Sequence, residues 1–385
     1  MSLRIGFDGK RIVKNATGLG NYCRTLVTEL ATLTPPLSLR LYVPSMGRDD
    51  LRSQLANSSA EFVLPHTAKS KIAQAWWRYK GIVPELQADH IDLFHGLSGE
   101  LPRGLRKAGI PAVVTIHDLI FLRHPEYYNP IDVAIYRHKF HLACHEADRI
   151  IAISERTKAD IIHFGQVSEE RIEVVYQSCE PSFTTPISEA ERQNVLRHYG
   201  LSEGYVLSVG SIEARKNALL TLEAVAQTPH LRLVLVGRPT KYADRLRHRA
   251  EQLGLGHRFV MLHGVPSEHL PALYRSAIAF AYPSRYEGFG IPIIEALCAD
   301  LPVVGATGSC LEEAGGDDQL YVHPDDTTTM AQHLLRLASS PEERTARAAK
   351  GKAYVQRFLG QQQAKRLRAI YEQVVSEHAI ASAQR

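Results

Sequence analysis

The stretch that decides the fold is YPSRYEGFGIPIIEALCA, Tyr282–Ala299. It predicts the end of a strand, then a loop, then a helix, because the apolar run Ile278–Ala281 precedes it and Pro292 suits the first position of a helix. Gly288 and Gly290 let the loop backbone approach a ligand closely. A strand that leads through a glycine loop into a helix N-terminus is suited to hold an anion such as a diphosphate.

Two carboxylates flank this loop. Glu287 comes just before the glycines and Glu295 lies one turn inside the helix, so we expect them on opposite sides of the anion. One would then reach sugar hydroxyls and the other ribose hydroxyls. The amides of Phe289, Gly290 and Ile291 should point at the anion itself. A capped helix with two solvated glutamates is the alternative.

A second motif follows the expected strand Tyr205–Val209. The chain continues there with Gly210 and then with Arg215 and Lys216, two adjacent cations at the carboxyl end of a strand. Arginine offers a forked donor and lysine a point charge, a pair suited to neutralising a leaving diphosphate. Surface decoration is the alternative for such a pair, and its place beside the glycine loop favours the functional interpretation.

Short apolar runs alternate with helical stretches along both halves of the chain, which predicts βαβ units and parallel sheets. The pattern restarts near Tyr205 after a looser segment, Cys179–Ser188. We therefore expect an α/β protein with two doubly wound, Rossmann-like domains, residues 1–180 and 188–360, with a closing helix around 361–385 joined to the first. The expected strands are Leu3–Phe7, Leu39–Val43, Ile91–Phe94, Ala112–Ile116, Arg149–Ile153, Tyr205–Val209, Leu231–Val236, Phe259–Leu262, Ile278–Ala281 and Val303–Gly305.

Composition excludes several classes of protein. The 385 residues are 44% hydrophobic and 22% charged, and the net charge of +4 is too mild to indicate a nucleic-acid partner. The five cysteines are scattered without metal-ligand spacing, so neither a disulfide framework nor a metal site is expected. The start lacks a signal-peptide hydrophobic region and no apolar run could span a membrane, which predicts a cytoplasmic protein.

These motifs resemble the retaining glycosyltransferases of family four, which have the GT-B fold and include many bacterial mannosyl- and glucosyltransferases. The likeness rests on YEGFGIP-x2-E with seven residues between Glu287 and Glu295, on Gly210…Arg215-Lys216-Asn217, and on the segment His263–Ala277. It implies a cleft between two facing domains. A departure is Gln177-Ser178, where relatives often have Asn-Gly.

The resemblance also implies roles for these residues. Glu287 and the amides near Gly290 would hold the donor sugar and phosphates. Arg215 and Lys216 would bind the diphosphate, and Glu295 the ribose. The base would lie on the loop His263, Gly264 and Val265.

The first domain carries fainter signals. Thr17-Gly18-Leu19-Gly20 opens a helix after the first strand, and no dinucleotide fingerprint is complete there because Cys23 stands at the third glycine position. In the resembled family a similar loop, here Gly18 and Gly20, borders the donor phosphates. His117 and Asp118 directly follow the strand Ala112–Ile116. The resemblance places the histidine over the donor sugar.

The predicted reaction is hexose transfer with retention, without metal or cofactor, since cations and helix amides supply the positive charge. GDP-mannose is the first candidate donor and a UDP-hexose the second. The acceptor is expected to be a glycan or a lipid-linked sugar in cell-surface polysaccharide synthesis. A nucleotide-sugar epimerase, a glycan phosphorylase and a non-catalytic sugar-nucleotide-binding protein remain as alternatives.

Contact with the inner face of the membrane is a further possibility. Trp76 and Trp77 stand among cations, Lys69, Lys71, Arg78 and Lys80, on an expected helix. Core packing of the two indole rings is one interpretation, and an interfacial patch that meets a lipid-linked acceptor is the other.

Overall fold

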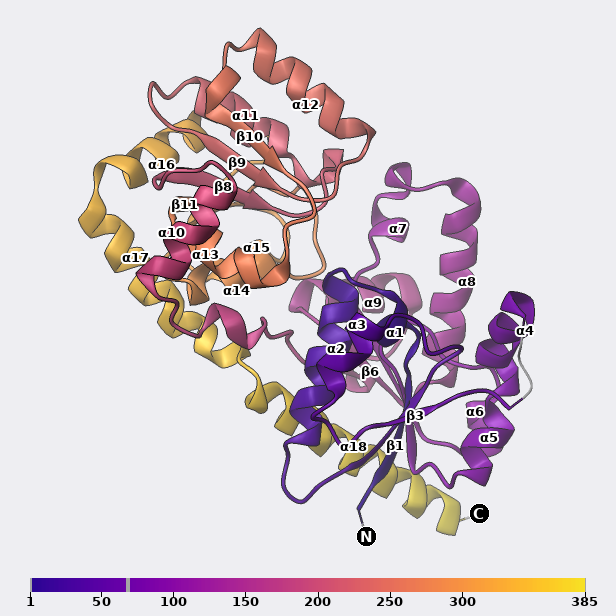
Figure 1. Cartoon of the computed structure of the whole chain (residues 1–385). Coiled ribbons are helices and arrows are strands. Elements are labelled where there is room, and N and C mark those ends of the chain that lie inside the picture. The colour runs from indigo at the N-terminus through magenta and orange to yellow at the C-terminus, as the bar shows by residue number, and fades with distance from the viewer. Residues whose placement is uncertain (1, 67–69, 385) are drawn as a thin grey trace. The chain divides into compact units, whose positions relative to one another are not determined.

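The computed structural model describes residues 2–66 and 70–384, so Lys69 lies outside the described residues. The chain divides into two compact units, Met1–Ser178 with Phe358–Arg385, and Cys179–Arg357. Each unit holds a parallel sheet with helices packed on it (Figure 1).

The sheet of the first unit pairs its strands in parallel in the order β3-β2-β1-β4-β5-β6-β7. Its central strands are almost wholly buried and apolar, as expected where helices cover both faces of a sheet. The strands are β1 (Arg4–Asp8), β2 (Ser38–Tyr42), β3 (Glu61–Val63), β4 (Leu93–Gly96), β5 (Ala112–Ile116), β6 (Arg149–Ala152) and β7 (Ile172–Val174).

Two apolar clusters cover the two faces of this sheet. The closing helix α18 (Gln361–Ala383) contributes Leu367, Ile370 and Tyr371 to the cluster that also holds α2 (Gly18–Ala31), and it runs beside α2 (Figure 1). The remaining helices of the unit are α1 (Lys10–Lys14), α3 (Asp49–Arg52), α4 (Lys71–Trp76), the π-helical turn η2 (Trp77–Gly81), α5 (Val83–Ala88), α6 (Leu105–Ala108), α7 (Ile120–Arg123), α8 (Pro130–Glu146) and α9 (Glu155–Gly165).

The sheet of the second unit is also parallel, in the order β10-β9-β8-β11-β12-β13. Its strands are β8 (Tyr205–Val209), β9 (Leu233–Val236), β10 (Phe259–Leu262), β11 (Ala277–Tyr282), β12 (Val303–Ala306) and β13 (Leu320–Val322). Its helices are α10 (Glu189–His198), α11 (Ala218–Ala226), α12 (Lys241–Gln252), α13 (Leu270–Arg275), α14 (Ile291–Cys298), α15 (Leu311–Gly315), α16 (Thr327–Ser339) and α17 (Pro341–Val355).

Both sheets have a topological switch point, where the chain changes the direction in which it adds strands. In the first sheet it lies between β1 and β4, and in the second between β8 and β11. Ligands of open parallel sheets bind at the carboxyl ends of the strands beside such a point. The switch points therefore mark the two places where this fold is prepared to hold a ligand.

The expected α/β class with two doubly wound parallel sheets is confirmed. Three strands were not predicted, β3, β7 and β13, and each is an edge strand of three residues. The fourth strand runs over Leu93–Gly96 rather than Ile91–Phe94, because His95 is buried at the strand end with both ring nitrogens bonded, one by the Tyr371 hydroxyl and one by Thr115.

The two tryptophans have opposite environments. Trp77 is 4% exposed and its indole N–H donates to Glu85 at 2.9 Å, whereas Trp76 is 61% exposed. The interpretation that the indole ring packs in the core is therefore correct for Trp77 and wrong for Trp76.

Candidate functional site in the second unit

The candidate site is built on the two loops that leave β8 and β11 at the switch point of the second sheet. After β8 the backbone passes through Gly210, whose φ of 151° is a conformation that glycine adopts most readily. A short 3₁₀ turn, Ala214–Lys216, then presents the two cations. Asn217, in the left-handed region at φ 56°, ties this turn to the other loop by donating to the carbonyl of Pro283 at 3.2 Å.

The side chains of the two loops meet in one charge cluster. The carboxylate oxygen Oε1 of Glu287 lies 2.6 Å from Nζ of Lys216 and 3.0 Å from Nη1 of Arg215. The hydroxyl of Tyr282, at the end of β11, accepts from Lys216 at 2.6 Å and lies 3.3 Å from the same carboxylate oxygen. Arg215 also donates to the carbonyl of Tyr286. The cluster thus places two cations and one carboxylate at a strand end.

Burial and pairing set the charges of this cluster. Burial alone would raise the pKa of Glu287, but Lys216 and Arg215 outweigh it and lower that pKa to about 2. Burial would lower the pKa of Lys216, and the Glu287 carboxylate reverses this and raises it. Burial beside Glu287 raises the pKa of Tyr282 to about 12. The centre of the cluster therefore pairs Lys216 and Arg215 with the Glu287 carboxylate beside a neutral phenol, and the Glu213 carboxylate lies 3.9 Å from Arg215 at its edge.

Cys310 is buried against the backbone of the loop that carries Glu287. Its thiol lies 2.7 Å from the carbonyl oxygen of Phe289 and 3.1 Å from that of Glu287. Gly290 has φ 146°, and a Cβ there would lie 3.1 Å from Cβ of Ala314. Gly290 is followed at once by α14, and its carbonyl accepts the amide of Ile293 at 2.9 Å, so it caps the first turn of that helix. The packing thus fixes the start of α14 beside Glu287.

Glu295 lies on α14 and accepts a hydrogen bond from the hydroxyl of Tyr274 at 2.8 Å. Its residue is only partly buried as a whole, yet burial of the carboxyl raises its pKa to about 7, with the Tyr274 hydrogen bond acting in the opposite direction. Glu295 is therefore protonated in part at neutral pH, unlike Glu287. The two glutamates have opposite electrostatic environments on one loop-and-helix segment.

The loop after β10 carries the residues expected to meet the base. His263 is exposed, and its Nδ1 lies 2.9 Å from the carbonyl oxygen of Gly237. Gly264 has φ 64° with open space where a Cβ would be, and Val265 is half-buried. These residues follow β10, the edge strand of the second sheet. β9 lies between β10 and β8, the strand that leads to Arg215 and Lys216.

His117 lies in the first unit, directly after β5. Its Nε2 lies 2.8 Å from the carbonyl oxygen of Leu97 and must donate to it, so Nδ1 accepts from the side-chain amide of Gln177, also at 2.8 Å. Burial lowers the pKa of His117 to about 4, so the ring is neutral at physiological pH. Asp118 accepts from the amide of Ile120 at 3.1 Å and so supports the start of α7.

The two glycines that open α2 differ in their surroundings. A Cβ on Gly20 would lie 1.8 Å from the carbonyl oxygen of Asn15, so the fold itself requires glycine there. A Cβ on Gly18 would meet no atom within 4 Å. Gly18 is therefore the one of the two whose lack of a side chain leaves room for a ligand.

The structure brings Arg215, Lys216, Gly210 and Glu287 together, with the start of α14 beside them. Three residues that organise the predicted sites were not predicted: Tyr282, Cys310 and Gln177. Tyr282 could have been found as the last residue of its strand. The contacts of Cys310 and Gln177 depend on segments far apart in the chain and leave no local signal.

The described residues, 2–66 and 70–384, contain no group of three or more His, Cys, Asp or Glu arranged to hold a metal ion. Within the same residues, no helix combines the length and the apolar character needed to cross a bilayer.

Two family models match the chain. Residues 16–183 match the model described as Glycosyltransferase Family 4, and residues 198–354 match the model described as Glycosyl transferases group 1. Together the matches extend over most of both units.

Curated relatives and solved structures agree with the family models. The chain is 30% identical to O-antigen chain mannosyltransferase B of Escherichia coli over 375 residues, covering 92% of this chain and 96% of the relative. It is 28% identical to O-antigen chain mannosyltransferase RfbU of Salmonella typhimurium, covering 60% and 61% of the two chains. The Anabaena protein HepE in complex with UDP and glucose has a similar fold, with a TM-score of 0.77 at 18% identity over 96% and 100% of the two chains.

Proposed function

The chain belongs to the family 4 glycosyltransferases of the GT-B fold, a family of retaining hexosyltransferases, and we propose that it transfers mannose from GDP-mannose to a glycan or lipid-linked acceptor. The observation that carries the proposal is the charge cluster of the second unit. Lys216 and Arg215 converge on Glu287 at a switch point, beside the start of α14.

The choice of donor is supported by similarity. The relative with 30% identity over most of the chain is an O-antigen mannosyltransferase, which favours mannose and therefore GDP-mannose. HepE, whose fold is similar, is described with UDP and glucose, so a UDP-hexose is the second candidate. Because two relatives are O-antigen chain mannosyltransferases, we propose that the product belongs to a cell-surface polysaccharide, with lipopolysaccharide as the first candidate.

In the proposed reaction the bond between the anomeric carbon and the diphosphate oxygen breaks. Lys216, Arg215 and the amides of Phe289, Gly290 and Ile291 stabilise the negative charge that develops on the departing phosphate. The acceptor oxygen attacks from the same face, and the departing phosphate takes the acceptor's proton. The new glycosidic bond then has the configuration of the donor, and metal is not required.

The remaining residues would position the donor. We assign Glu287 to the sugar hydroxyls, Glu295 to the ribose, and the loop His263, Gly264 and Val265 to the base. Gly210 and Gly288 would allow close approach of the phosphates, as would Gly18 from the first unit, while Gly20 would keep the start of α2 in the conformation that presents Gly18. His117, a neutral ring at physiological pH, would contact the sugar without transferring a proton, and Asp118 would support it.

We also propose that the protein works on the inner face of the membrane, bound peripherally. Ile72 is 84% exposed and Trp76 61% exposed on the helix α4, an apolar pair that costs free energy in water. A groove of about 570 Å³ beside Trp76 is lined by Lys80, Arg103 and Lys107. Exposed indole and alkyl groups beside cations are suited to an anionic bilayer surface.

Cosedimentation with vesicles tests the membrane proposal. Binding is expected with phosphatidylglycerol vesicles and not with phosphatidylcholine vesicles, and replacing Ile72 and Trp76 by serine should abolish it. Equal binding to both vesicles, or binding that survives the double substitution, would overturn this part.

The transfer reaction itself is tested with labelled donors. GDP-[¹⁴C]mannose and UDP-[¹⁴C]glucose are each incubated with lipid-linked oligosaccharides in EDTA, and NMR of the product gives the anomeric configuration. Transfer of mannose in EDTA, with the anomeric configuration of the donor kept in the product, supports the proposal. Release of an epimerised sugar without acceptor would indicate the epimerase alternative, and binding without turnover would indicate a non-catalytic protein.

A further inference from the structure

The imidazole ring of His117 has a hydrogen-bond partner at each of its two nitrogens. Nε2 donates to the carbonyl of Leu97, and the side-chain amide of Gln177 donates to Nδ1, both at 2.8 Å. Leu97 lies on the loop after β4 and Gln177 lies beyond β7, so the partners reach the ring from different segments of the first unit. Both polar positions of the ring are therefore used within the protein.

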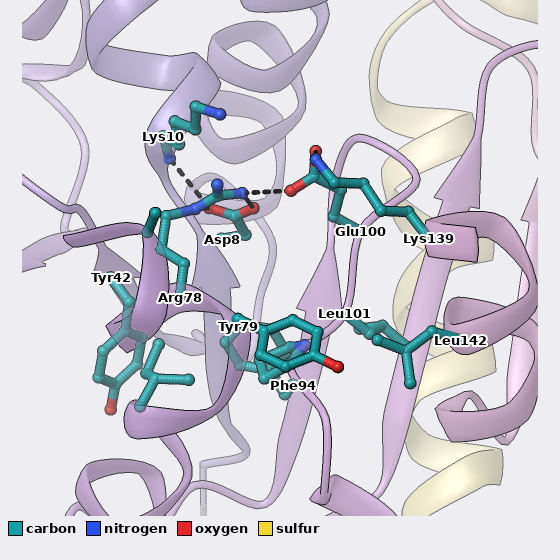
Figure 2. Close-up of a pocket in the computed structure, with 13 residues that line it drawn as sticks. Asp8, Lys10, Tyr42, Arg78, Tyr79, Phe94, Glu100, Leu101, Lys139 and Leu142 are labelled. Carbon is teal, nitrogen blue, oxygen red and sulfur yellow. Dashed lines mark hydrogen bonds and ion pairs between the residues drawn. The ribbon is translucent and has the colours of Figure 1, made fainter. Parts of the chain in front are cut away.

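The loop that carries Leu97 also contributes to a charged hollow of about 230 Å³ at the switch point between β1 and β4 (Figure 2). The charged side chains that line this hollow are Asp8, Lys10, Arg78, Glu100 and Lys139. Glu100, three residues after Leu97, accepts from Arg78 at 2.9 Å and from Lys139 at 3.0 Å. These two ion pairs hold the loop, so the carbonyl that meets His117 has a fixed place.

Gln177 is 4% exposed, and the residues on both sides of it are hydrogen-bonded to helices. The backbone amide of Tyr176 donates to the side-chain oxygen of Gln363 on α18 at 3.1 Å. The hydroxyl of Ser178 donates to the carboxylate of Glu29 on α2 at 2.9 Å. These bonds hold the side-chain amide of Gln177 against the imidazole ring before any ligand binds.

The two partners determine where the proton of His117 lies. A carbonyl oxygen can only accept, so Nε2 carries the proton. Nδ1 then keeps a lone pair, which the amide N–H of Gln177 meets. A second proton, on Nδ1, would point at a donor and lose this hydrogen bond.

The other groups around the ring also favour its neutral form. Burial, and after it Arg11 on α1, lowers the pKa of His117 to about 4, with the Leu97 hydrogen bond acting in the opposite direction. Burial lowers the pKa of His95 on β4 to about 3, so that ring is also neutral. Tyr22 on α2 packs edge-on, with 4.8 Å between ring centroids, and burial raises its pKa. The carboxylate of Asp118 accepts from the first amide of α7.

We propose that Gln177 is a positioning residue that keeps His117 as a neutral ring with its proton on Nε2, an inference that rests on the proposed contact of His117 with the donor sugar. As the bond to the diphosphate breaks, the sugar ring gains positive charge, and an imidazolium beside it would oppose that charge. His117 is half-buried, so its carbon face can meet the sugar while both nitrogens stay bonded. Gln177 acts on the reaction only through His117.

Long-range ¹H–¹⁵N NMR of the full chain labelled with ¹⁵N-histidine shows which nitrogen carries the proton, and His117→Phe identifies the signals of His117. In the wild type we expect Nε2 protonated and Nδ1 unprotonated between pH 6 and pH 8. Gln177→Glu puts an acceptor in place of the amide donor, so Nδ1 should be protonated at pH 7. Gln177→Met offers no donor, so the Nδ1 signal should move while the proton stays on Nε2. Gln362→Glu, the same change at an exposed glutamine on α18, should alter neither signal.

The value of kcat at saturating donor supplies the functional measurement. Gln177→Glu should lower kcat by about ten-fold or more at pH 6 and by less at pH 8, because a raised pKa leaves His117 charged at the lower pH. In a His117→Phe background the same change should alter kcat by less than about two-fold. Gln177→Met and Gln362→Glu should show no such dependence on pH.

The inference is overturned by a proton on Nδ1 in the wild type, by an unprotonated Nδ1 in Gln177→Glu, or by an unmoved Nδ1 signal in Gln177→Met. Equal loss of kcat with and without His117 would also overturn it, because the role of Gln177 would then be structural. If Gln177→Glu does not fold, the wild type and Gln177→Met decide. The spectra need no donor, so expected spectra in a wild type that transfers no hexose would contradict the proposed function instead.

Discussion

Glu287 and Lys216 form a buried ion pair, with 2.6 Å between Oε1 and Nζ, and Arg215 shares the same oxygen at 3.0 Å. The carboxylate therefore holds both cations in place before any ligand arrives. Preorganised charge of this kind stabilises a developing negative charge without reorganisation during the reaction. We therefore propose two roles for Glu287: it binds the sugar hydroxyls, and it positions Lys216 and Arg215 for the diphosphate.

The two glutamates should be separable by kinetics. Glu287→Gln removes the charge that positions Lys216, where contacts strengthen in the transition state, so it should mainly lower kcat. Glu295→Gln should mainly raise the donor KM, because ribose contacts do not change during the reaction. Donor-saturation kinetics at one fixed acceptor concentration distinguish the two. The opposite result would be a lower kcat alone in Glu295→Gln and a weaker donor affinity alone in Glu287→Gln. It would reverse the assignment of Glu287 to the sugar and Glu295 to the ribose.

Donor affinity should depend on pH through Glu295, whose pKa is raised to about 7 by burial. The ionised carboxylate accepts ribose hydroxyls better than the protonated acid, so donor KM should rise as pH falls below about 7, by up to about ten-fold per unit. The same raised pKa means that the stability Glu295 contributes is full below its ordinary value of 4.5 and is lost as pH rises through about 7.

Glu295→Gln provides the control for this pH effect, since glutamine does not titrate in this range. The donor KM of that variant should be nearly flat between pH 6 and pH 8. An equally steep pH profile in Glu295→Gln would show that another group is responsible.

The glycines that open α2 make a matched pair. Gly20→Ala should lower the melting temperature, because its Cβ would lie 1.8 Å from the carbonyl oxygen of Asn15. Gly18→Ala should leave the melting temperature nearly unchanged, because nothing lies within 4 Å of its Cβ, yet lower kcat/KM if a ligand approaches there. Thermal unfolding and steady-state kinetics are measured on both. Full activity in a stable Gly18→Ala variant would remove Gly18 from the donor site.

Every central strand was predicted, although β4 was shifted by two residues, whereas three of the four edge strands were missed, for a physical reason. Strands such as Ala112–Ile116 and Tyr205–Val209 are buried on both faces and consist mostly of apolar residues, so their bounds agree with the structure. The unpredicted strand Glu61–Val63 is a three-residue edge strand with an exposed first residue. Such a strand is fixed by pairing with β2 rather than by its own pattern.

The same distinction holds for the sites. Arg215, Lys216 and Glu287 stand in local motifs next to strand ends and could be proposed from spacing alone. Gln177, which donates to His117 from 60 residues away, could not. The charged hollow was also missed, because Asp8, Arg78 and Glu100 come from three separate segments that only the first sheet and its π-helical turn bring together.

Turnover should survive excess EDTA. Lys216, Arg215 and the amides of residues 289–291 supply the positive charge that a divalent cation gives in other transferases. The measurement is initial rate with and without EDTA, followed by addition of Mg²⁺ or Mn²⁺. A rate that disappears in EDTA and returns with either metal would contradict the proposed metal-independent mechanism.

The most direct test of the account is titration of GDP and UDP into the wild type and Lys216→Ala by calorimetry in EDTA. We expect a nucleoside diphosphate to bind the wild type and to bind Lys216→Ala far more weakly, with turnover lower by about 100-fold or more, since one preorganised donor is worth roughly 2.7–4 kcal/mol. Lys350→Ala, an exposed lysine on α17, should bind as the wild type does. Equal nucleotide affinity and near-normal turnover in a folded Lys216→Ala variant would contradict the assignment of this cluster to the donor diphosphate.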